Sequence, residues 1–275
     1  MVYAPKFATK INTKDLDRKI RVGAVSYLNT KPLLYGIRRS AVMEDVELKI
    51  DYPSKIASML LNDEIDLGLV PVAIVPQMKK HYFNGDYCIG SDGPVASVCL
   101  FSEVPIEKVK TILLDYQSRS SVQLVRILAK KYWNIDPEFV DGGEEFRKQI
   151  IGSVAAVVVG DRALEQRKMS TYVYDLGEAW KSFTNLPFVY AAWISNKQLD
   201  GEFIRRFNEA NAFGLQHIEE LIREEPFLLY DLATYFSKNI SYTFTQEKRK
   251  GMALFLEMLK EQQDLPEFES LVSKK

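Results

Sequence analysis

The sequence predicts an α/β fold, because short β-rich runs alternate along the chain with stretches of helical periodicity. Repeated βα units of this kind imply a mostly parallel sheet with helices on both faces. Two further β-rich runs, residues 96–101 and 187–194, bracket a central block of such units, and no Gly/Ser-rich linker divides the chain. The residues alone therefore leave two architectures open, which are two lobes joined by two crossing strands and a single doubly wound sheet.

In the two-lobed alternative, the chain crosses between the lobes at these two runs. Residues 102–190 then form one lobe, residues 20–95 together with 195–275 form the other, and a cleft separates them. Residues 1–19 are polar and are expected to be an N-terminal extension outside the fold.

The first third of the chain alternates strands with helices. The pattern predicts strands over residues 20–27, 46–52 and 67–70. A helix follows each strand, beginning near Pro32, Pro53 and Pro71, because proline is tolerated in the first helical turn, where its missing N–H costs nothing.

The pattern continues over the middle of the chain and then changes. Strands are predicted over residues 111–114, 155–159, 171–174 and 187–194, and helices over 120–133, 161–166 and 178–184. The run 155–159 is almost wholly apolar, which is typical of a strand buried in a parallel sheet. After residue 196 only helices are predicted, over 203–223, 226–236 and 245–262, the last with Thr245 as its N-cap.

The composition argues against several functional classes. The 36 basic and 37 acidic residues nearly cancel, so we expect no nucleic-acid partner. Cys88 and Cys99 do not form a CxxC pair, and no disulfide framework is expected. His81 and His217 lie far apart in the chain, and because a zinc site normally needs three or four ligands, no metal is expected.

The sequence also lacks recognisable membrane-spanning or signal segments and several common catalytic motifs. No run of about 20 apolar residues occurs, so no transmembrane helix and no membrane partner are expected. Residues 1–19 hold no apolar stretch long enough for a signal peptide, and we expect a cytoplasmic protein. The GxGxxG, Walker, HExxH and GxSxG motifs are absent, which disfavours the hydride-transfer, nucleotide-hydrolysis, zinc-protease and α/β-hydrolase classes.

Polar turns follow three predicted strands, at the place where open α/β sheets bind ligands. The first turn runs from Ser26 through Tyr27 to Thr30. It offers the Asn29 amide and the Thr30 hydroxyl beside a helix N-terminus, whose free N–H groups attract anions. Ordinary helix capping is the alternative explanation for Asn and Thr at this place.

The second turn contains Ser91, Gly93, Val95 and Ser97. Gly93 precedes a proline, and this pair sets a turn that could present backbone N–H groups and the Ser97 hydroxyl to a carboxylate. An ordinary hairpin turn explains the same residues equally well.

The third turn places Ser118, Arg119, Ser120 and Ser121 between a predicted strand and a predicted helix. Hydroxyls, a guanidinium and helix N–H groups together make a competent carboxylate clamp. A helix cap beside a surface arginine is the alternative.

Two more strand ends carry polar residues. Gly160-Asp161 follows one strand, and Asp175 and Glu178 follow another. The two aspartates are expected first as N-caps and Glu178 as a solvated first-turn residue, and each could instead face the cleft as a hydrogen-bonding group or weak base. From the residues alone, the prediction ends at a cleft for a small anion.

The same turns match a family pattern in order along the chain. The matching blocks are VGAVSYLNTKPL (22–33), EIDLGLVPV (64–72), GPVASV (93–98), SRSSV (118–122), GDRAL (160–164) and YDLGEAW (174–180). This set resembles the chorismate dehydratases of the futalosine route to menaquinone. The departures are Ser120, where Thr is common, and Asn185, where Gly is common.

The resemblance implies a type 2 periplasmic-binding-protein-like fold and a hydro-lyase activity. The family converts chorismate to 3-[(1-carboxyvinyl)oxy]benzoate and water, without a cofactor. The small-molecule substrate, chorismate, is the partner that the resemblance implies.

The resemblance also suggests roles for particular residues. Asn29 and Ser97 are the expected catalytic residues, which position the substrate and its leaving hydroxyl. The ring proton passes to the enolpyruvyl carboxylate of the substrate or to a weak side-chain base. The expected substrate-binding residues are Tyr27, Thr30, Ser91, Gly93, Val95, Ser118, Arg119, Ser120, Ser121, Gly160, Asp161 and Glu178.

Two alternatives stay open at this stage. A 1,4-dihydroxy-6-naphthoate synthase of the same pathway shares the fold and acts on a larger, cyclised substrate. A non-catalytic cytoplasmic binding protein for a small carboxylate represents a different functional class.

Overall fold

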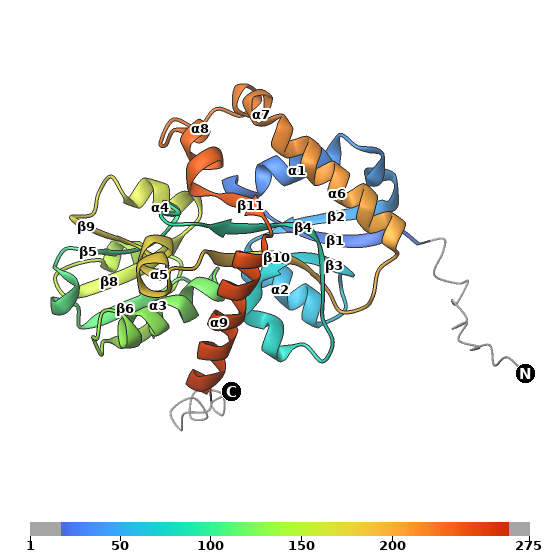
Figure 1. The fold of residues 1–275 in the computed structure, drawn as a ribbon. Helices are drawn as coiled ribbons and strands as arrows, with labels where there is room; N and C mark the ends of the chain where they lie inside the picture. The colour runs from blue at the N-terminus through green and yellow to red at the C-terminus, as the bar shows by residue number, and fades with distance from the viewer. Residues whose placement is uncertain (1–17, 264–275) are drawn as a thin grey trace, which may run out of the picture.

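The computed structural model describes residues 18–263 and has two lobes, each built on its own β-sheet (Figure 1). The first lobe has the strand order β11-β4-β10-β3-β1-β2, and the second has the order β7-β6-β8-β5-β9. The predicted two-lobed α/β architecture is therefore confirmed, and the single doubly wound sheet is wrong.

The strands are β1 (Ile20–Val25), β2 (Val46–Asp51), β3 (Leu67–Pro71), β4 (Tyr82–Ser91), β5 (Val98–Ser102), β6 (Thr111–Leu114), β7 (Glu138–Asp141), β8 (Val154–Val159), β9 (Tyr172–Asp175), β10 (Phe188–Ser195) and β11 (Ser241–Thr243). The α-helices are α1 (Lys31–Arg38), α2 (Pro53–Leu61), α3 (Ser120–Lys131), α4 (Asp161–Gln166), α5 (Leu176–Thr184), α6 (Gly201–Gln216), α7 (Ile218–Glu224), α8 (Leu232–Thr234) and α9 (Gln246–Gln263).

Each sheet is mixed, and the prediction of mostly parallel sheets is wrong. The βα units do give parallel pairs, because β1 runs parallel to β2 and β3, and β6 runs parallel to β7 and β8. By contrast, β10 is antiparallel to β3, and β5 is antiparallel to β8. The physical reason is the crossing itself, since a strand that arrives from the other lobe enters its sheet at the cleft and runs outward.

The chain passes from the first sheet to the second between Ser91 and Val98, and it returns between Thr184 and Phe188. The crossings predicted at 96–101 and 187–194 overlap β5 and β10, and each of these strands pairs within one sheet only. By strand pairing, β10 therefore belongs to the first lobe as a whole, which differs from the predicted lobe boundary at residue 190.

Several elements differ from the sequence prediction. The strands β4, β7 and β11 were not predicted, and β4 holds Asn84, Gly85 and Asp86, which are depleted in strands. Pairing of β4 with both β10 and β11 overrides that local preference. The predicted helix 203–223 is divided into α6 and α7 at His217.

The C-terminal helices show one further difference and one agreement. The predicted helix 226–236 begins only at Leu232 and continues as a π-helical turn over Tyr235–Asn239. The Thr245 N-cap is confirmed, because its Oγ1 accepts a hydrogen bond from Lys248 N–H at 3.3 Å. Of the predicted N-terminal extension, residues 1–17 lie outside the described residues, and Arg18 pairs with the buried carboxylate of Asp66.

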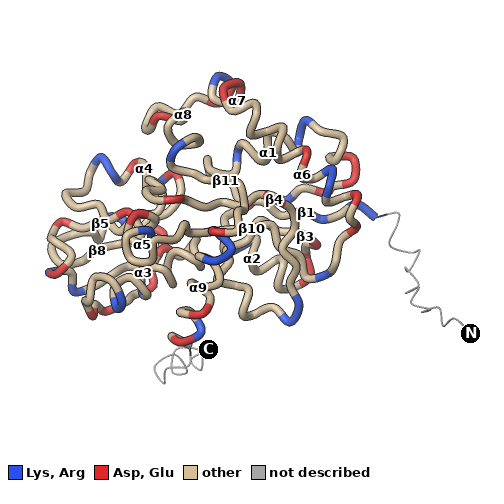
Figure 2. The backbone as a smooth tube through the Cα atoms, in the orientation of Figure 1, with Lys and Arg blue, Asp and Glu red and all other residues tan. Residues whose placement is uncertain are grey.

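Helix α9 braces both lobes along the face that Figure 1 shows in front. The Phe255 ring lies edge-on to Phe188 of the first sheet and to Trp180 of α5, with centroid separations of 5.0 and 6.3 Å. In the view of Figure 2, basic and acidic residues are interspersed over both lobes. No helix among residues 18–263 is long and apolar enough to cross a membrane.

Helices α1 and α6 pack backbone against backbone, and this contact sets the direction of α1. A Cβ built at Gly214 would lie 1.8 Å from Pro32 O, and one built at Gly36 would lie 1.8 Å from Ala210 O. Only glycine permits this approach, which holds the N-terminal end of α1 toward the cleft.

We expect Gly214→Ala to lower the free energy of unfolding by about 2 kcal/mol, because overpacking a close contact forces the helices apart. Gly201→Ala is the matched control on the same helix, where a new Cβ meets nothing within 4 Å. The control should be neutral within about 0.5 kcal/mol. Urea unfolding followed by tryptophan fluorescence measures both, and equal stability of the two variants would contradict the backbone contact.

Candidate active site

A pocket lies between the lobes, at the ends of strands from both sheets. It is smaller than the roughly 300–1,000 Å³ of typical small-molecule sites. The centre of a water-sized molecule can move through only about 50 Å³ of it, so the pocket is narrow. The lining residues are Val25, Tyr27, Asn29, Thr30, Pro53, Pro71, Ile89, Val98, Ser118, Ser120, Ser121, Val159, Gly160, Tyr190 and Ala191.

Asn29 projects from a 3₁₀ turn, Leu28–Thr30, that leads directly into α1. The buried Thr30 hydroxyl donates to Asn29 Oδ1 at 3.2 Å. This bond uses the oxygen of the amide, so the Nδ2 group is left to donate to a ligand. The first polar turn is therefore both a helix start and part of the pocket lining.

The serines of the third turn begin α3 on the opposite wall. Ser118 Oγ accepts from Ser121 N–H at 3.2 Å, which is the capping contact that the alternative explanation predicts. Ser120 Oγ donates to Tyr190 O at 2.9 Å and accepts from Ala73 N–H at 3.2 Å, so its hydroxyl ties the second lobe to the first. The N-terminus of a 12-residue helix thus faces the pocket, and it favours an anion there by about 0.3–1 kcal/mol.

The pocket presents no charged side chain to a ligand. Among the described residues, none of those that line it is Asp, Glu, His, Lys or Arg. Burial raises the pKa of the Tyr27 hydroxyl and raises that of Tyr190 well above its ordinary value. Both tyrosines are therefore neutral at physiological pH, and the site offers hydrogen bonds and helix dipoles in place of charge.

Hydrogen bonds join the lobes around the pocket, so the lobes are closed on one another. Tyr27 Oη donates to Gln117 Oε1 at 2.5 Å, and Leu28 N–H donates to Asp161 Oδ1 at 3.0 Å. Ser54 N–H donates to Gln117 O at 3.1 Å. These three contacts span the gap between the lobes on the side of the 3₁₀ turn.

Gly160 forms the floor beneath the Tyr27 ring. Its φ is +69°, in the left-handed region that favours glycine, and an added Cβ would lie 2.9 Å from three atoms of the ring. The predicted place of Gly160 in the site thus has a steric reason.

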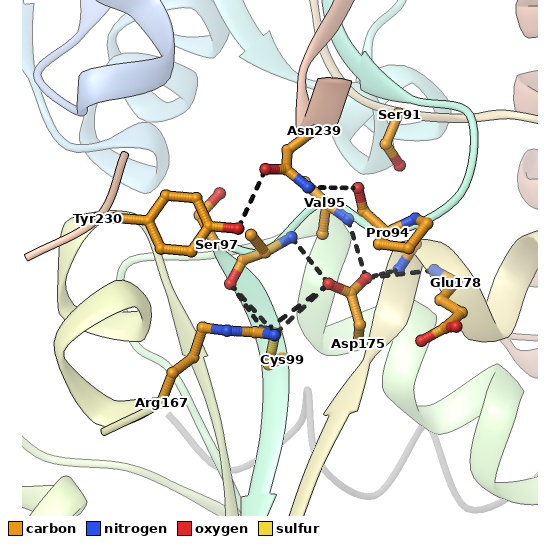
Figure 3. Close-up of polar contacts among 12 residues, drawn as sticks. Ser91, Pro94, Val95, Ser97, Cys99, Arg167, Asp175, Glu178, Tyr230 and Asn239 are labelled. Atoms are coloured by element: carbon orange, nitrogen blue, oxygen red, sulfur yellow. Dashed lines mark hydrogen bonds and ion pairs between the residues drawn. The ribbon is translucent and has the colours of Figure 1, made fainter. Parts of the chain in front are cut away.

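The second turn does bind a carboxylate, but the carboxylate belongs to the chain. Asp175 accepts hydrogen bonds from Val95 N–H at 3.0 Å and from Ala96 N–H at 2.7 Å (Figure 3). It also accepts from Gly177 N–H and Glu178 N–H, so the predicted N-cap role of Asp175 is confirmed. The N–H groups predicted to bind a substrate are therefore occupied by the side chain at the end of β9, and this contact fastens the crossing segment to the second lobe.

Other residues of that turn also lie outside the pocket lining. Ser91 and Val95 are completely buried, and Gly93, with φ +115°, turns the chain where it leaves β4. Ser97 is completely buried as well, and its Oγ accepts from Tyr235 Oη at 2.7 Å. Ser97 borders the site through its backbone, because Ser97 O accepts from Gly160 N–H at 2.8 Å.

Three charged residues of the predicted site have other contacts. Arg119 lines a neighbouring cavity and donates from Nη2 to Ser58 Oγ at 3.2 Å, so it does not complete a clamp with the serines. Asp161 follows the Gly160 N-cap and binds Leu28 across the cleft, where burial raises its pKa. Glu178 is exposed in the first turn of α5, as its alternative explanation predicts.

The sequence prediction missed the apolar walls of the pocket and Tyr190. Trp180 and Trp193 are buried in the core and do not line the pocket. The only signal for Tyr190 was its place on a predicted crossing strand.

Cys88 and Cys99 are free and buried, and no group of three or more potential metal ligands occurs within residues 18–263.

Comparison with known proteins identifies relatives in sequence and in structure. The model of a family described as menaquinone biosynthesis matches residues 20–261. A chorismate dehydratase of Thermus thermophilus is 25% identical over 269 residues, which cover 86% of this chain and 94% of that protein. Protein AF1704 from Archaeoglobus fulgidus superposes with a TM-score of 0.71 at 14% identity, over 90% of this chain and 97% of the other.

A second solved structure, that of a binding protein, shares the same fold. The periplasmic aliphatic sulphonate binding protein SsuA from Escherichia coli superposes with a TM-score of 0.59 at 16% identity, over 90% of this chain and 94% of the other. The expected periplasmic-binding-protein-like fold is thus confirmed.

The raised pKa of Asp161 predicts a pH dependence of stability. Because burial makes the folded protein hold this proton more tightly than the unfolded chain does, the free energy of unfolding should fall as the pH rises from the ordinary carboxyl pKa, about 4, through the raised one. Asp161→Asn keeps an oxygen acceptor for Leu28 N–H and cannot titrate, so the variant should be more stable than wild type above that range and similar below it.

Urea unfolding at a series of pH values measures this difference. Asp92→Asn, at an exposed position, is the matched control. Identical curves for Asp161→Asn and wild type at every pH would show that the buried carboxylate carries no such cost.

Proposed function

This chain belongs to the menaquinone biosynthesis family, and from that premise we propose that it is a hydro-lyase that converts chorismate to 3-[(1-carboxyvinyl)oxy]benzoate and water. The Thermus thermophilus relative is named for this activity, and the similarity extends over 94% of that protein. The order of sequence blocks that resembles the chorismate dehydratases supports the same assignment.

One observation of the structure supports the proposal most. The pocket combines neutral hydrogen-bond donors on opposite walls with apolar side chains between them, such as Val25, Val98 and Val159. Chorismate has the matching pattern, because its two carboxylates lie on either side of a hydrocarbon ring. The helix start near Thr30 and the N-terminus of α3 are the two places where the carboxylates would be stabilised.

The reaction is an elimination that needs no change of oxidation state overall. The C3–H bond of the ring breaks, its electron pair forms the last ring double bond, and the C4–O bond breaks to release hydroxide. The hydroxide takes up the proton lost from C3, so the products are the aromatic ether and one water. Gain of aromaticity makes the step downhill, and the protein has to orient the substrate, receive the proton and support the leaving oxygen.

Asn29 is the group proposed to support the leaving hydroxyl. Its Oδ1 accepts from Thr30, and its Nδ2 has no hydrogen-bond partner among residues 18–263, so we propose that it donates toward a developing negative charge on oxygen. Ser118 and Ser121, with the first N–H groups of α3, are proposed to hold a carboxylate on the facing wall. Ser97 is proposed to help position the substrate from the wall that contains Gly160, because its backbone oxygen accepts a hydrogen bond from Gly160 N–H.

The proton acceptor is proposed to be the enolpyruvyl carboxylate of the substrate. The described residues that line the pocket include no carboxylate, imidazole or amine, and the two tyrosines are kept protonated by burial. A carboxylate within the substrate itself is a base that arrives already close to C3.

Closure of the lobes is proposed to be part of catalysis. The pocket is too narrow in the closed arrangement for a ring acid to enter from solvent, so the lobes must part to admit it. The contacts of Tyr27 with Gln117 and of Leu28 with Asp161 would then re-form over the bound substrate and exclude water from the reacting atoms.

Incubation of the purified protein with chorismate tests the activity. We expect mass spectrometry to detect a product lighter than chorismate by one water, at a rate proportional to protein concentration. Binding of chorismate without loss of mass would instead indicate a non-catalytic binding protein. Neither binding nor loss of mass would favour the naphthoate synthase, which acts on a larger substrate.

Asn29→Ala should lower kcat/KM for chorismate by about 10²–10³, the loss typical of one donor to a developing oxyanion. Asn62→Ala, at an exposed position after α2, is the matched control and should keep wild-type kinetics. Wild-type turnover by both Asn29→Ala and Ser97→Ala would show that the proposed roles are wrong.

A further inference from the structure

A C-terminal segment reaches both polar walls of the pocket, although it lies far from them in sequence. The segment consists of the π-helical turn Tyr235–Asn239 and the strand β11. Tyr235 and Tyr242 are buried to 0% and 6% exposure. A buried phenol is costly unless its hydroxyl is bonded, and each of these two hydroxyls is bonded to a segment that carries a proposed active-site residue.

Tyr242 holds the turn that presents Asn29. Its Oη donates to Asn29 O at 2.9 Å. The adjacent Leu28 N–H is bonded to Asp161 of the other lobe at 3.0 Å. The backbone of the 3₁₀ turn is thus held at two consecutive residues, from the first lobe by Tyr242 and from the second lobe by Asp161. These contacts restrict movement of the backbone that carries the Asn29 side chain.

Tyr235 holds the opposite part of the site through Ser97. Its Oη donates to Ser97 Oγ at 2.7 Å, and Ser97 O in turn accepts from Gly160 N–H at 2.8 Å. The three residues form a continuous chain of hydrogen bonds from the C-terminal segment to the floor of the pocket.

Asn239 adds a contact to the same crossing segment. Its Nδ2 donates to Pro94 O at 3.2 Å, and its Oδ1 accepts from Tyr230 Oη at 3.2 Å (Figure 3). The π-helical turn, closed by Ile240 N–H on Tyr235 O, brings residues 235 and 239 to the same side of the chain. Such turns are frequent at functional sites because they re-aim side chains.

Burial keeps both hydroxyls in the donor form. It raises the pKa of Tyr235, and it raises the pKa of Tyr242 well above its ordinary value. The contacts to Ser97 and Asn29 O therefore persist over the pH range in which the protein works.

We propose that residues 235–242 are a positioning element of the active site, in which Tyr242 acts through Asn29 and Tyr235 acts through Ser97. This inference rests on the proposed dehydration of chorismate. Neither tyrosine lines the pocket, so neither is a catalytic residue. Their effect is on the placement of the groups that meet the transition state, and small misplacements of such groups can cost up to about 10²-fold in rate.

The principal test is Tyr242→Phe, which removes one oxygen and keeps the ring. We expect kcat for chorismate to fall at least about tenfold with a smaller change in KM, because the lost alignment matters most in the transition state. Tyr87→Phe is the matched control, since it lies on β4 opposite Thr243 of β11 and its hydroxyl has no hydrogen-bond partner among residues 18–263. The control should keep wild-type kcat.

A double-mutant cycle separates positioning from general destabilisation. If Tyr242 acts through Asn29, Tyr242→Phe should have no further effect on kcat in the Asn29→Ala background. The same cycle for Tyr235→Phe and Ser97→Ala tests the second pair. Equal kcat for Tyr242→Phe and Tyr87→Phe, or fully multiplicative losses in the cycles, would overturn the proposal.

Backbone amide exchange gives a readout that does not depend on activity. Tyr242→Phe should speed hydrogen exchange in a peptide covering residues 26–34 relative to wild type and Tyr87→Phe. If the wild-type protein does not dehydrate chorismate, the proposed function fails, and the exchange result still decides whether Tyr242 holds the turn. Unchanged exchange in this peptide would overturn the positioning role in either case.

Discussion

The constraint on which this structure depends is that the strands of both sheets end at one cleft. Parallel strands such as β1 and β6 deliver the helices that follow them, α1 and α3, with their N-termini toward the cleft. Two facing lobes therefore place the start of α1 opposite the start of α3 without any charged residue between them. The close backbone contact of α1 with α6 at Gly36 and Gly214 preserves this direction. An anion is favoured at such a place by dipoles and N–H groups that are already oriented before it binds.

Two carboxylates of the chain occupy backbone N–H groups outside the pocket that could otherwise bind an anion. Asp175 occupies the N–H groups of the crossing segment, and Asp115 accepts from Val159 N–H and Gln117 N–H while paired with Arg162 at 2.7 Å. These internal contacts make the crossing segment and the strand ends rigid. They also leave the pocket as the place between the lobes where helix N–H groups and hydroxyls remain open to a ligand, among the residues that the structure describes. Rigid walls of this kind are what an elimination needs when the enzyme supplies alignment more than acid or base.

The fold is shared with a sulphonate binding protein, so the architecture does not by itself distinguish binding from catalysis. A binding protein and an enzyme with this fold would differ in the contacts that the pocket makes with its ligand. A neutral site with a fixed amide donor at Asn29 can support a departing hydroxyl, and closure over the substrate removes the water that would otherwise compete for its hydrogen bonds.

Local pattern in the sequence was enough to predict the βα units and the polar turns, because strand ends, prolines and small polar residues act over a few positions. The same pattern left the two-lobed architecture and a single doubly wound sheet as alternatives. Of the residues predicted for the site, the structure places these around one pocket: Tyr27, Asn29, Thr30, Ser118, Ser120, Ser121 and Gly160. Only the tertiary structure decided that Asp175 fills the second turn, that Arg119 points to a neighbouring cavity and that β10 enters its sheet antiparallel. The physical reason is distance along the chain, since Val95 meets a residue 80 positions away and Asn29 meets Tyr242 at a separation of 213. Such pairings depend on how the lobes and the C-terminal segment pack, and no local preference encodes them.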